Sequence, residues 1–578
     1  MAELGAALGG PARAAAAGPA PLVKPQVGRD EWILRLGLVV IGGYLLVALA
    51  LPLMVMLSKS FQRREEFVGL ANYVQYFSTP SLFASIQNSF SVAIVSTLIT
   101  VPLAFLYAYA LTRSAMPGKG LFKTIALIPI LMPSLLPGIG LVYLFGNQGL
   151  IKGLLFGQKI YGPIGIVLAE VFFTFPHAML ILLTALSLAD ARLYEAAVSL
   201  RASPARIFRT VTLPGVRYGL ISATFVVFTM VITDFGAPKV IGGQYNVLAT
   251  DVYKQVIGQQ NFEMGATVSV LLLLPAVLAF VVDQVAQRRQ VALLSARAVP
   301  LVPAPARRFD LIMLACCSAI GVYLVAIVAV SQFAALVKFF PYDLTLTLGH
   351  YDFDSRGIGG WTAYRNSIVL ALATAAIGTV VVFVGAYLVE KGRGFRLGRM
   401  AFQFLAMLPM AVPGMVLGLA YIFFFNDPRN PLGGIYRTMT ILVLNTIVHF
   451  YTVAHLTALT ALKQMDPEFE TVSASLRQPV YRVFGRVTVP VCLPAILDMA
   501  IYLFVNAMTT VSGVVFLWGP NTELASIVVI DLDDAGQTAS AAAMAMMIIY
   551  TNIAARIAHA ALARWLDRRT QAWRGLAR

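Results

Sequence analysis

The feature that most constrains this chain is a succession of long apolar runs that continues through nearly all of its 578 residues. Each run exceeds about 20 residues, and a helix of that length crosses the roughly 30 Å hydrocarbon core of a bilayer. A transmembrane barrel would instead show short alternating segments separated by turns. We therefore predict an all-α polytopic membrane protein of about 12 transmembrane helices, at 33–57, 86–111, 121–145, 163–187, 214–236, 262–286, 309–333, 365–389, 400–425, 438–461, 490–517 and 537–562.

The charge pattern agrees with a membrane protein and predicts its orientation. Charged residues make up 12 % of the chain, and the formal net charge is +16. This excess does not indicate a nucleic-acid partner, because Lys and Arg lie in short loops between apolar runs, as in cytoplasmic loops. We expect a multi-pass protein of the bacterial inner membrane, surrounded by lipid, with both termini in the cytoplasm.

Motifs for catalysis or metal binding are missing from the sequence. The three cysteines, Cys316, Cys317 and Cys492, all fall in apolar runs and form neither a disulfide framework nor a metal-ligand pattern. No GxxxxGK[ST] phosphate loop occurs; the nearest stretch, PGKG at 117–120, lacks the first glycine and the Ser or Thr. The chain is therefore not expected to be an enzyme or to carry a cofactor, and any ATP would be bound by a partner.

An internal repeat divides the chain into two parallel halves. A shift of 276 residues brings several polar and proline positions into register: Asp190 with Asp466, Ser199–Arg201 with Ser475–Arg477, Arg206 with Arg482, Phe208 with Phe484, and Pro214 with Pro490. A shift of 280 pairs Pro129 and Pro133 with Pro409 and Pro413. Chance matches in an apolar chain would favour Leu and Val, so we infer a duplication of a six-helix unit.

The repeat also predicts the domain boundaries. We expect a disordered cytoplasmic tail at 1–30, a first six-helix domain at 31–286 and a cytoplasmic linker at 287–308. A second six-helix domain would follow at 309–565, with a basic tail at 566–578. An even number of crossings separates the halves, so they share one orientation.

The best-matched part of the repeat is a polar loop between the fourth and fifth helices of each half. Asp190 and Asp466 can each cap the start of a short helix. Leu193, Ala196, Ala197 and Leu200 then fall on one helical face. Ser203 and Pro204 start a second short helix, and Pro214 opens the next membrane helix. Simple connections in helical bundles usually take only about 2–8 residues, so this loop predicts a docking surface.

This stretch, EAAVSLRASPARIFRTVTLP at 195–214, resembles the EAA loop of type I binding-protein-dependent ABC importer permeases. In that family the loop forms a coupling helix that docks on a cytoplasmic ATPase subunit. The matching residues are Asp190, Glu195, Ala196, Ala197, Phe208 and Pro214 in the first copy, and Asp466, Phe484 and Pro490 in the second. Leu200 and its repeat partner Leu476 complete the predicted coupling set. The resemblance implies two ATPase copies and a periplasmic or extracellular substrate-binding protein.

The loops depart from the family pattern at two places. Arg201 and Arg477 stand where the family has glycine, and Thr471 stands where the first copy has Glu195. The two docking surfaces are therefore expected to be unequal.

Ionisable and polar side chains inside the predicted helices are candidates for the translocation path. Glu170 and His177 lie two turns apart on the fourth helix, and Asn445, His449 and Thr452 form a stripe on the tenth. A count along the fifth helix places Asp234 near its outer end. For each of these, an interhelical hydrogen bond is the alternative to substrate contact. The paired prolines predict kinks at matched depths.

The substrate is predicted from resemblance alone. The stretch from Thr233 to Ala266 resembles fused permeases assigned to 2-aminoethylphosphonate import, and more loosely two-domain permeases for ferric ion and thiamine. We take 2-aminoethylphosphonate as the lead substrate, with ferric ion or thiamine as alternatives. A different class, a secondary transporter of 12 helices, remains the main alternative, but the loop RSAMPGKG at 113–120 lacks the Asp-Arg signature of such carriers. A channel or scaffold is a further alternative.

Overall fold

The computed structural model describes residues 28–292, 299, 301–356, 359–392, 394–466 and 468–570. Within these residues, eight helices are long and apolar enough to cross a membrane, and four bent helix pairs raise the possible number of spans to 12. The predicted all-α polytopic fold is confirmed. Residues 1–27 of the tail predicted at 1–30, residues 571–578 of the tail predicted at 566–578, residues 293–298 and 300 of the predicted linker, and Pro467 lie outside the described residues.

The first half follows the predicted order of six spans. Its elements are α1 (Arg29–Leu45), η1 (Leu46–Ala50), α2 (Leu51–Lys59), β1 (Gln62–Arg63), β2 (Glu66–Phe67), α3 (Ala71–Ser78), α4 (Pro80–Arg113), α5 (Lys119–Leu127), η2 (Ile128–Leu131), α6 (Leu136–Phe145), η3 (Lys152–Leu155), α7 (Pro163–Ser187), α8 (Ala191–Ser199), α9 (Pro204–Ile207), η4 (Phe208–Thr212), α10 (Leu213–Thr233), α11 (Gly236–Ile241), α12 (Leu248–Tyr253), η5 (Lys254–Gly258) and α13 (Phe262–Ala292).

The second half repeats this order with small differences. Its elements are α14 (Arg307–Leu336), β3 (Val337–Phe339), β4 (Asp343–Leu346), η6 (Gly349–Tyr351), η7 (Asp354–Arg356), α15 (Gly360–Lys391), α16 (Arg396–Met407), η8 (Leu408–Ala411), α17 (Gly414–Phe425), η9 (Gly433–Ile435), α18 (Met439–His449), α19 (Tyr451–Lys463), α20 (Glu468–Ser475), α21 (Val480–Val483), η10 (Phe484–Thr488), α22 (Val489–Val491), α23 (Leu493–Thr509), α24 (Ala525–Asp534) and α25 (Thr538–Thr570).

The paired prolines bend the third span of each half. The break between η2 and α6 turns the chain by 107°, and the equivalent break between η8 and α17 turns it by 115°. Proline lacks the backbone N–H that would continue the helix ladder, so both spans change direction near it. The predicted kinks are confirmed, and they are sharp enough to direct α6 and α17 across the bundle.

The first helix of each half packs against the other half. Tyr421 of α17 donates a hydrogen bond to the Ala48 carbonyl of η1, with 2.6 Å between the oxygens. In the reciprocal contact, Tyr323 of α14 donates to the Leu168 carbonyl of α7, also at 2.6 Å. The backbone N–H of Gly394 likewise donates to Glu31 of α1. Each half therefore completes its helix packing with a helix supplied by the other.

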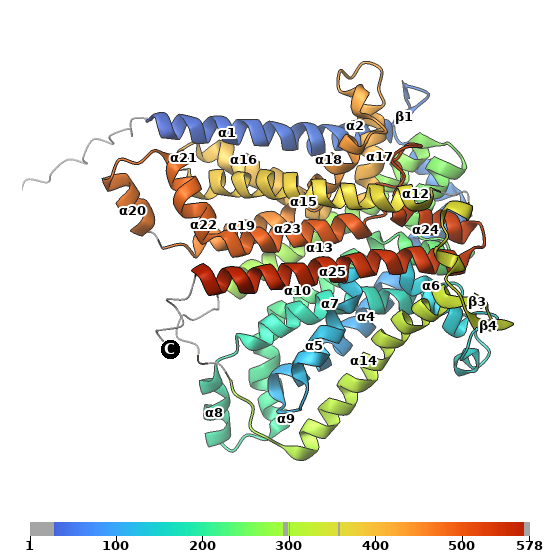
Figure 1. Ribbon diagram of the computed structural model, residues 1–578, viewed down its shortest axis with the longest axis horizontal. Helices are drawn as coiled ribbons and strands as arrows, with labels where there is room; N and C mark the ends of the chain where they lie inside the picture. The colour runs from blue at the N-terminus through green and yellow to red at the C-terminus, as the bar shows by residue number, and fades with distance from the viewer. Residues whose placement is uncertain are drawn as a thin grey trace, which may run out of the picture.

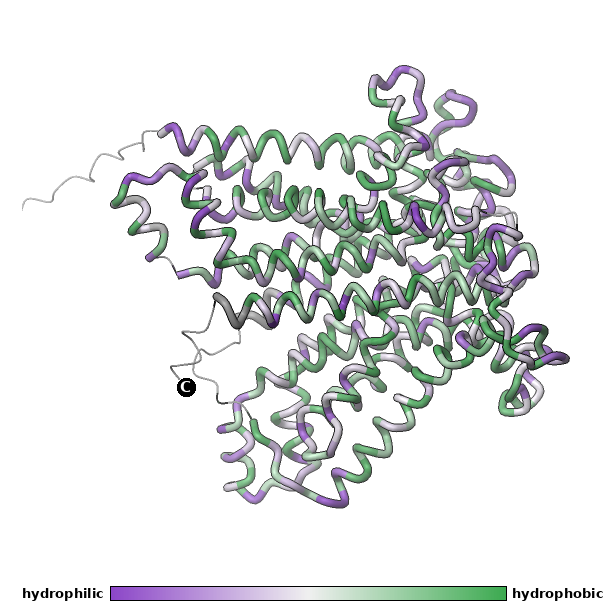
Figure 2. Tube along the Cα trace, viewed as in Figure 1, coloured by the Kyte–Doolittle hydropathy of each residue, from purple (hydrophilic) through white to green (hydrophobic). Residues whose placement is uncertain are grey.

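The two ends of the bundle differ in composition and in shape. Apolar residues fill the middle of the bundle, whereas hydrophilic residues gather at its two ends (Figure 2). In Figure 1 the start of α1, the end of α25 and the helices α8 and α20 lie at one end, where α8 and α20 are far apart. At the opposite end, which carries α12, α24 and both β-hairpins, the two halves converge. We refer to these as the α8/α20 end and the α12/α24 end.

Candidate functional site: a cavity between the halves and two docking loops

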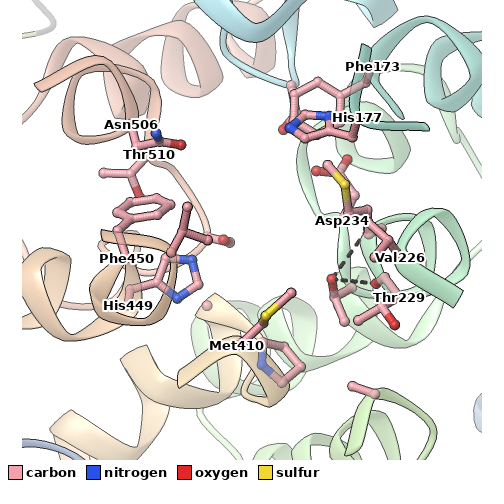
Figure 3. Close-up of a pocket in the computed structure, with 18 of the residues that line it drawn as sticks. Phe173, His177, Val226, Thr229, Asp234, Met410, His449, Phe450, Asn506 and Thr510 are labelled. Carbon is pink, nitrogen blue, oxygen red and sulfur yellow. Dashed lines mark hydrogen bonds between the residues drawn. The ribbon is translucent and has the colours of Figure 1, made fainter. Parts of the chain in front are cut away.

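A cavity of about 430 Å³ lies between the two halves. Its walls come from repeat-related segments: the turn before α6 and the end of α10 in the first half, and the turn before α17 and the end of α23 in the second. Figure 3 shows Asp234 and His177 on one side of this cavity and His449, Phe450 and Asn506 on the other. The duplicated fold therefore builds one chamber with two chemically different walls.

Three of the five predicted path residues line this cavity. They are Asp234, His177 and His449. Asp234 follows the last residue of α10, and its Oδ2 accepts a hydrogen bond from the backbone N–H of Ala237 at 2.9 Å. The prediction by helix length put Asp234 near the outer end of its helix; the structure places it directly after that helix, where it also lines the cavity.

The other two predicted residues, Glu170 and Asn445, are buried behind the walls. Glu170 lies beside the carboxyl group of Asp234. Apart from the neighbouring Asp234 carboxyl group, Glu170 has no hydrogen-bond partner among the described residues, and the side-chain amide of Asn445 has none either. The predicted stripe ends early, because the chain bends by 55° at Phe450 and Thr452 donates instead to the Ala406 carbonyl.

Sequence reasoning missed most of the opposite wall and one acidic residue. Tyr502, Asn506 and Thr510 line the cavity from α23 and the residue after it. The shift of 276 pairs Asp234 with Thr510, so the repeat could have identified this wall. Asp283 of α13 also lines the cavity, but its oxygens already accept hydrogen bonds from Ser222 and Gln287.

In each half, the turn at the start of α6 or α17 packs closely against the segment that follows α10 or α23. A side chain at Gly236 would overlap the hydroxyl of Ser134, and a side chain at Gly414 would overlap that of Ser512. Ser134 and Gly414 are repeat partners, as are Gly236 and Ser512. In the first half the serine lies in the turn before α6 and the glycine follows α10. In the second half the glycine lies at the start of α17 and the serine follows α23. In both halves the missing side chain of the glycine lets the two backbones approach closely.

Contacts between the halves close the α12/α24 end. Lys239 Nζ lies 3.0 Å from Asp534 Oδ2, and the same ammonium lies 5.2 Å from the ring centre of Tyr253. Tyr253 in turn stacks on Phe516 of the second half, with 6.3 Å between ring centres. A cation and an aromatic pair therefore join the halves at this end.

Several carboxyl groups surround Lys239. Burial raises the pKa of both Asp531 and Asp533 to about 6, and the neighbouring charge of Asp534 adds to each shift. The nearby Lys239 ammonium acts to lower the pKa of both carboxyl groups. At neutral pH these carboxyl groups are ionised and repel one another, so Lys239 offsets a repulsion that would otherwise separate the closed end.

The docking loops form as the sequence predicts. Asp190 Oδ1 accepts a hydrogen bond from the Arg192 N–H at the start of α8, and Asp466 Oδ1 accepts one from the Glu468 N–H at the start of α20. Both predicted caps are confirmed. Each cap satisfies a backbone donor that the first turn of a helix leaves without an intrahelical partner.

These loops expose apolar side chains. Leu200 is 82 % exposed and its repeat partner Leu476 is 65 % exposed. Glu195, Ala196 and Thr471 are also exposed, whereas Ala197 is half-buried. Apolar side chains that protrude this far from a polar loop are typical of a contact surface.

Phe208 and Phe484, predicted as part of the coupling loops, pack against the permease itself. Phe208 packs edge-on against Phe105 and Tyr109 of α4, with ring centres 6.0 and 5.9 Å away. Phe484 makes the equivalent contacts with Phe383 and Tyr387 of α15, at 6.0 and 4.7 Å. Both rings are partly buried against their own half, so they attach the loop to the permease.

The helix α10 begins at Leu213 with Pro214 in its first turn, as predicted. Helical structure of other types precedes it without a break from Pro204, so Pro214 also lies within one continuous helical span that ends at Thr233. A π-helical turn at 208–212 precedes Pro214, and another at 484–488 precedes Pro490. The wider turn accommodates a proline whose missing N–H would leave a gap in an α-helical ladder.

Arg201 and Arg477, at the family glycine position, adopt the left-handed conformation that glycine favours. Their φ angles are +52° and +49°. The turn is closed by the N–H of Ala202, which donates to the Ala197 carbonyl, and by the equivalent bond from Gln478 to Ser473. A residue with a Cβ pays about 1 kcal/mol for this conformation, so both loops keep the glycine geometry at an energetic cost.

Arg201→Gly is therefore expected to stabilise the end of α8 by about 1 kcal/mol, because glycine adopts the observed φ without strain. Amide hydrogen exchange of α8 should slow roughly fivefold. The control is Arg206→Gly inside α9, where glycine should speed exchange by a similar factor. Unchanged or faster exchange in Arg201→Gly would contradict the strain at this position.

Comparisons with known proteins agree with this architecture. The model of the family described as binding-protein-dependent transport system inner membrane component matches residues 100–291 and 382–568. The ferric transport system permease protein of Actinobacillus pleuropneumoniae is 28 % identical over 482 residues, covering 80 % of this chain and 68 % of that protein. The probable sulfate transport system permease protein of Nephroselmis olivacea is 28 % identical over 250 residues, covering 42 % of this chain and 85 % of that protein.

A solved structure is also similar. A chain of a bacterial ABC transporter involved in the import of the acidic polysaccharide alginate aligns with a TM-score of 0.39 and 18 % identity, covering 46 % of this chain and 98 % of that chain. The two family matches fall one in each half and together span more than half of the residues. They exclude the secondary-transporter alternative. The chain belongs to the binding-protein-dependent transport system inner membrane components, and it is the multi-pass permease subunit of an ABC importer, a family that works with an ATPase partner and a substrate-binding protein.

Proposed function

We propose that this permease conducts a metal cation of the ferric type. The observation that carries the proposal is the charge of the cavity: Asp234 and Asp283 line it, and none of the described lining residues is Lys or Arg. Carboxylate oxygens are the ligands that hard cations prefer. An oxyanion would face these carboxylates without a cationic partner, which is unfavourable in a site shielded from water.

The negative charge of the cavity lining favours one of the substrate classes between which sequence similarity alone does not decide. Relatives named for ferric transport and relatives named for sulfate transport both match this chain. The ferric relatives match across both halves, and the acidic cavity favours the same class. The lead substrate from the sequence, 2-aminoethylphosphonate, has less support, because its phosphonate group is an anion and no relative named above is assigned to it. We therefore replace it with the ferric alternative.

The mechanism that we propose is alternating access driven by two ATPase subunits, one on α8 and one on α20. Both termini would then lie in the cytoplasm, at the α8/α20 end. In the conformation described here the Lys239–Asp534 contact holds the α12/α24 end closed, and α8 and α20 lie far apart. ATP-driven approach of the ATPase subunits would bring α8 and α20 together, open the α12/α24 end and admit the substrate from its binding protein.

The test is uptake into proteoliposomes that contain this chain with its cognate ATPase and binding protein. We expect ATP-dependent uptake of ⁵⁵Fe(III) and no ATP-dependent uptake of radiolabelled 2-aminoethylphosphonate or sulfate. Proteoliposomes without ATP provide the control for leakage. Uptake of the phosphonate or of sulfate without uptake of iron would contradict the cation assignment while leaving the permease role intact.

A further inference from the structure

The first docking loop meets the membrane helices at a half-buried pair of side chains, Arg113 and Tyr194. Within α8 only Ala191, Tyr194 and Ala197 are buried or half-buried, and every other residue is exposed. Arg113 is the last residue of α4, and its guanidinium carbon lies 5.1 Å from the centre of the Tyr194 ring. Its Nη2 also donates to the Tyr194 hydroxyl at 3.4 Å. The face that α8 turns toward the permease is therefore held by an arginine.

Both side chains also contact other helices. Arg113 Nη2 donates to the Leu186 carbonyl near the end of α7 at 2.9 Å. The Tyr194 hydroxyl lies 3.1 Å from Oγ1 of Thr212, a buried residue of the turn η4 that leads into α10. A hydrogen bond from a charged donor is stronger than one between neutral groups. Arg113 and Tyr194 thus connect α8 to three membrane helices, α4, α7 and α10.

Two of these helices form a wall of the cavity. α7 contributes Phe173 and His177 to its lining, and α10 contributes Phe225 and Thr229. α4 packs along both of them. Coupling between distant sites is carried by packed helices and hydrogen bonds, because a close-packed interior does not deform continuously. A displacement of α8 that reaches α4, α7 and α10 therefore moves one wall of the chamber.

The second half has a different pair of residues at the equivalent positions. Lys391 is the last residue of α15, as Arg113 is of α4. The shift of 276 pairs Tyr194 with Glu470. Each half therefore combines a cation at the end of this helix with a loop residue that attracts a cation, an aromatic ring in one half and a carboxylate in the other. Two different sequences retain the same complementarity, which favours a role for the connection itself.

We propose that Arg113 and Tyr194 are positioning residues that transmit the motion of α8 to the membrane helices during transport. This inference rests on the proposed function, because it requires an ATPase that drives α8. Such a partner holds the exposed residues of α8 and moves the bundle through the opposite face, which carries Tyr194. Phe208 attaches only the following turn to α4, whereas Arg113 and Tyr194 join α8 itself to α4, α7 and α10.

Four variants separate transmission from packing. Arg113→Met removes the charge and all donors but keeps an unbranched stem. Arg113→Lys is the conservative variant, because lysine occupies the equivalent position of the second half. Tyr194→Phe keeps the ring and loses both hydroxyl contacts. Tyr218→Phe is the matched control: Arg217 lies 4.6 Å from the Tyr218 ring, but both residues belong to α10, so their contact links no two helices.

The measurements are the affinity for the ATPase subunit, the change in ATP hydrolysis on adding the binding protein, and ⁵⁵Fe(III) uptake into proteoliposomes. We expect Arg113→Met to reduce uptake about tenfold, the scale set by losing a charge-assisted hydrogen bond. ATP hydrolysis should continue at a rate that the binding protein no longer changes, so that more ATP is consumed per imported ion. Affinity for the ATPase should stay within about twofold of wild type.

The other variants grade this effect. Tyr194→Phe should change uptake in the same direction but less, whereas Arg113→Lys and Tyr218→Phe should stay close to wild type. Weaker ATPase binding in Arg113→Met, with uptake and hydrolysis reduced equally, would overturn the proposal, because Arg113 would then only hold the loop in shape. If Arg113→Met does not assemble, the comparison of Tyr194→Phe with Tyr218→Phe carries the test.

The transmission role and the proposed function can fail separately. Normal iron uptake by Arg113→Met would overturn the transmission role and leave the cation permease standing. If the wild-type protein imports no iron, the ferric assignment fails. The response of ATP hydrolysis to the binding protein then decides the role of Arg113: its loss in Arg113→Met supports transmission, and its retention overturns it.

Discussion

Leu200→Glu is expected to reduce ATP-driven uptake at least tenfold, because it places a charge at the most exposed apolar side chain of the first docking loop. Leu200 is 82 % exposed, so its burial has to come from a partner. Burying a leucine contributes about 1.5–3 kcal/mol, which corresponds to roughly 10- to 150-fold in affinity. Replacing it with a carboxylate loses this gain and adds a desolvation cost. Titration of the detergent-solubilised permease with its ATPase subunit measures the change in affinity.

The repeat provides an internal comparison for this experiment. Leu476→Glu alters the equivalent residue of the second loop and should also weaken ATPase association. Leu154→Glu is the matched control: Leu154 is similarly exposed but lies in η3, between α6 and α7, away from the docking loops. Wild-type affinity and uptake in both loop variants would show that these loops are not the docking surface.

Gly140→Leu should destabilise the permease strongly, because it blocks the packing between α6 and the helix α14 that the second half contributes. A Cβ at position 140 would lie 2.8 Å from Ser331 Oγ and 2.9 Å from the Ile327 carbonyl oxygen. Both atoms belong to α14, and the carbonyl is fixed in the helix backbone. Overpacking a well-packed site costs about 1–3 kcal/mol or more, and here the helices themselves would have to separate.

The measurement is the apparent unfolding temperature of the purified permease in detergent, together with the yield of assembled complex. Gly43→Leu provides the control, since Gly43 lies in the membrane helix α1 and a Cβ there meets no atom within 4 Å. We expect a clear loss for Gly140→Leu and little change for Gly43→Leu. Equal stability of the two variants would contradict the close contact between α6 and α14.

Local signals in the sequence predicted most of the secondary structure correctly. Asp190 and Asp466 cap their helices as expected, because a cap depends only on a side chain and the backbone two or three residues later. The paired prolines bend both third spans for an equally local reason. Pro214 lies in the first turn of α10 as expected, but the π-helical turn that joins this helix to α9 had no local signal in the sequence.

The site was predicted less completely, because its geometry depends on contacts between distant segments. Phe208 was predicted in the coupling loop; its contact with Phe105 of α4 joins residues far apart in the chain and had no local signal. Counting residues placed Asp234 at the end of its helix, where the structure has it. That this helix end lines a cavity depends on segments of both halves, which no local pattern describes.

The sequence by itself determined the class of this protein: an all-α membrane protein, built from two copies of one unit, with a docking loop in each. Apolar length, repeat register and capping residues are all properties of neighbouring positions or of a fixed shift. Only the tertiary structure decided that the halves exchange their first helices, and that Glu170 lies behind the cavity wall beside Asp234. The physical reason is that helix association in a membrane depends on close backbone approach and on rare polar contacts, which link residues far apart in the chain.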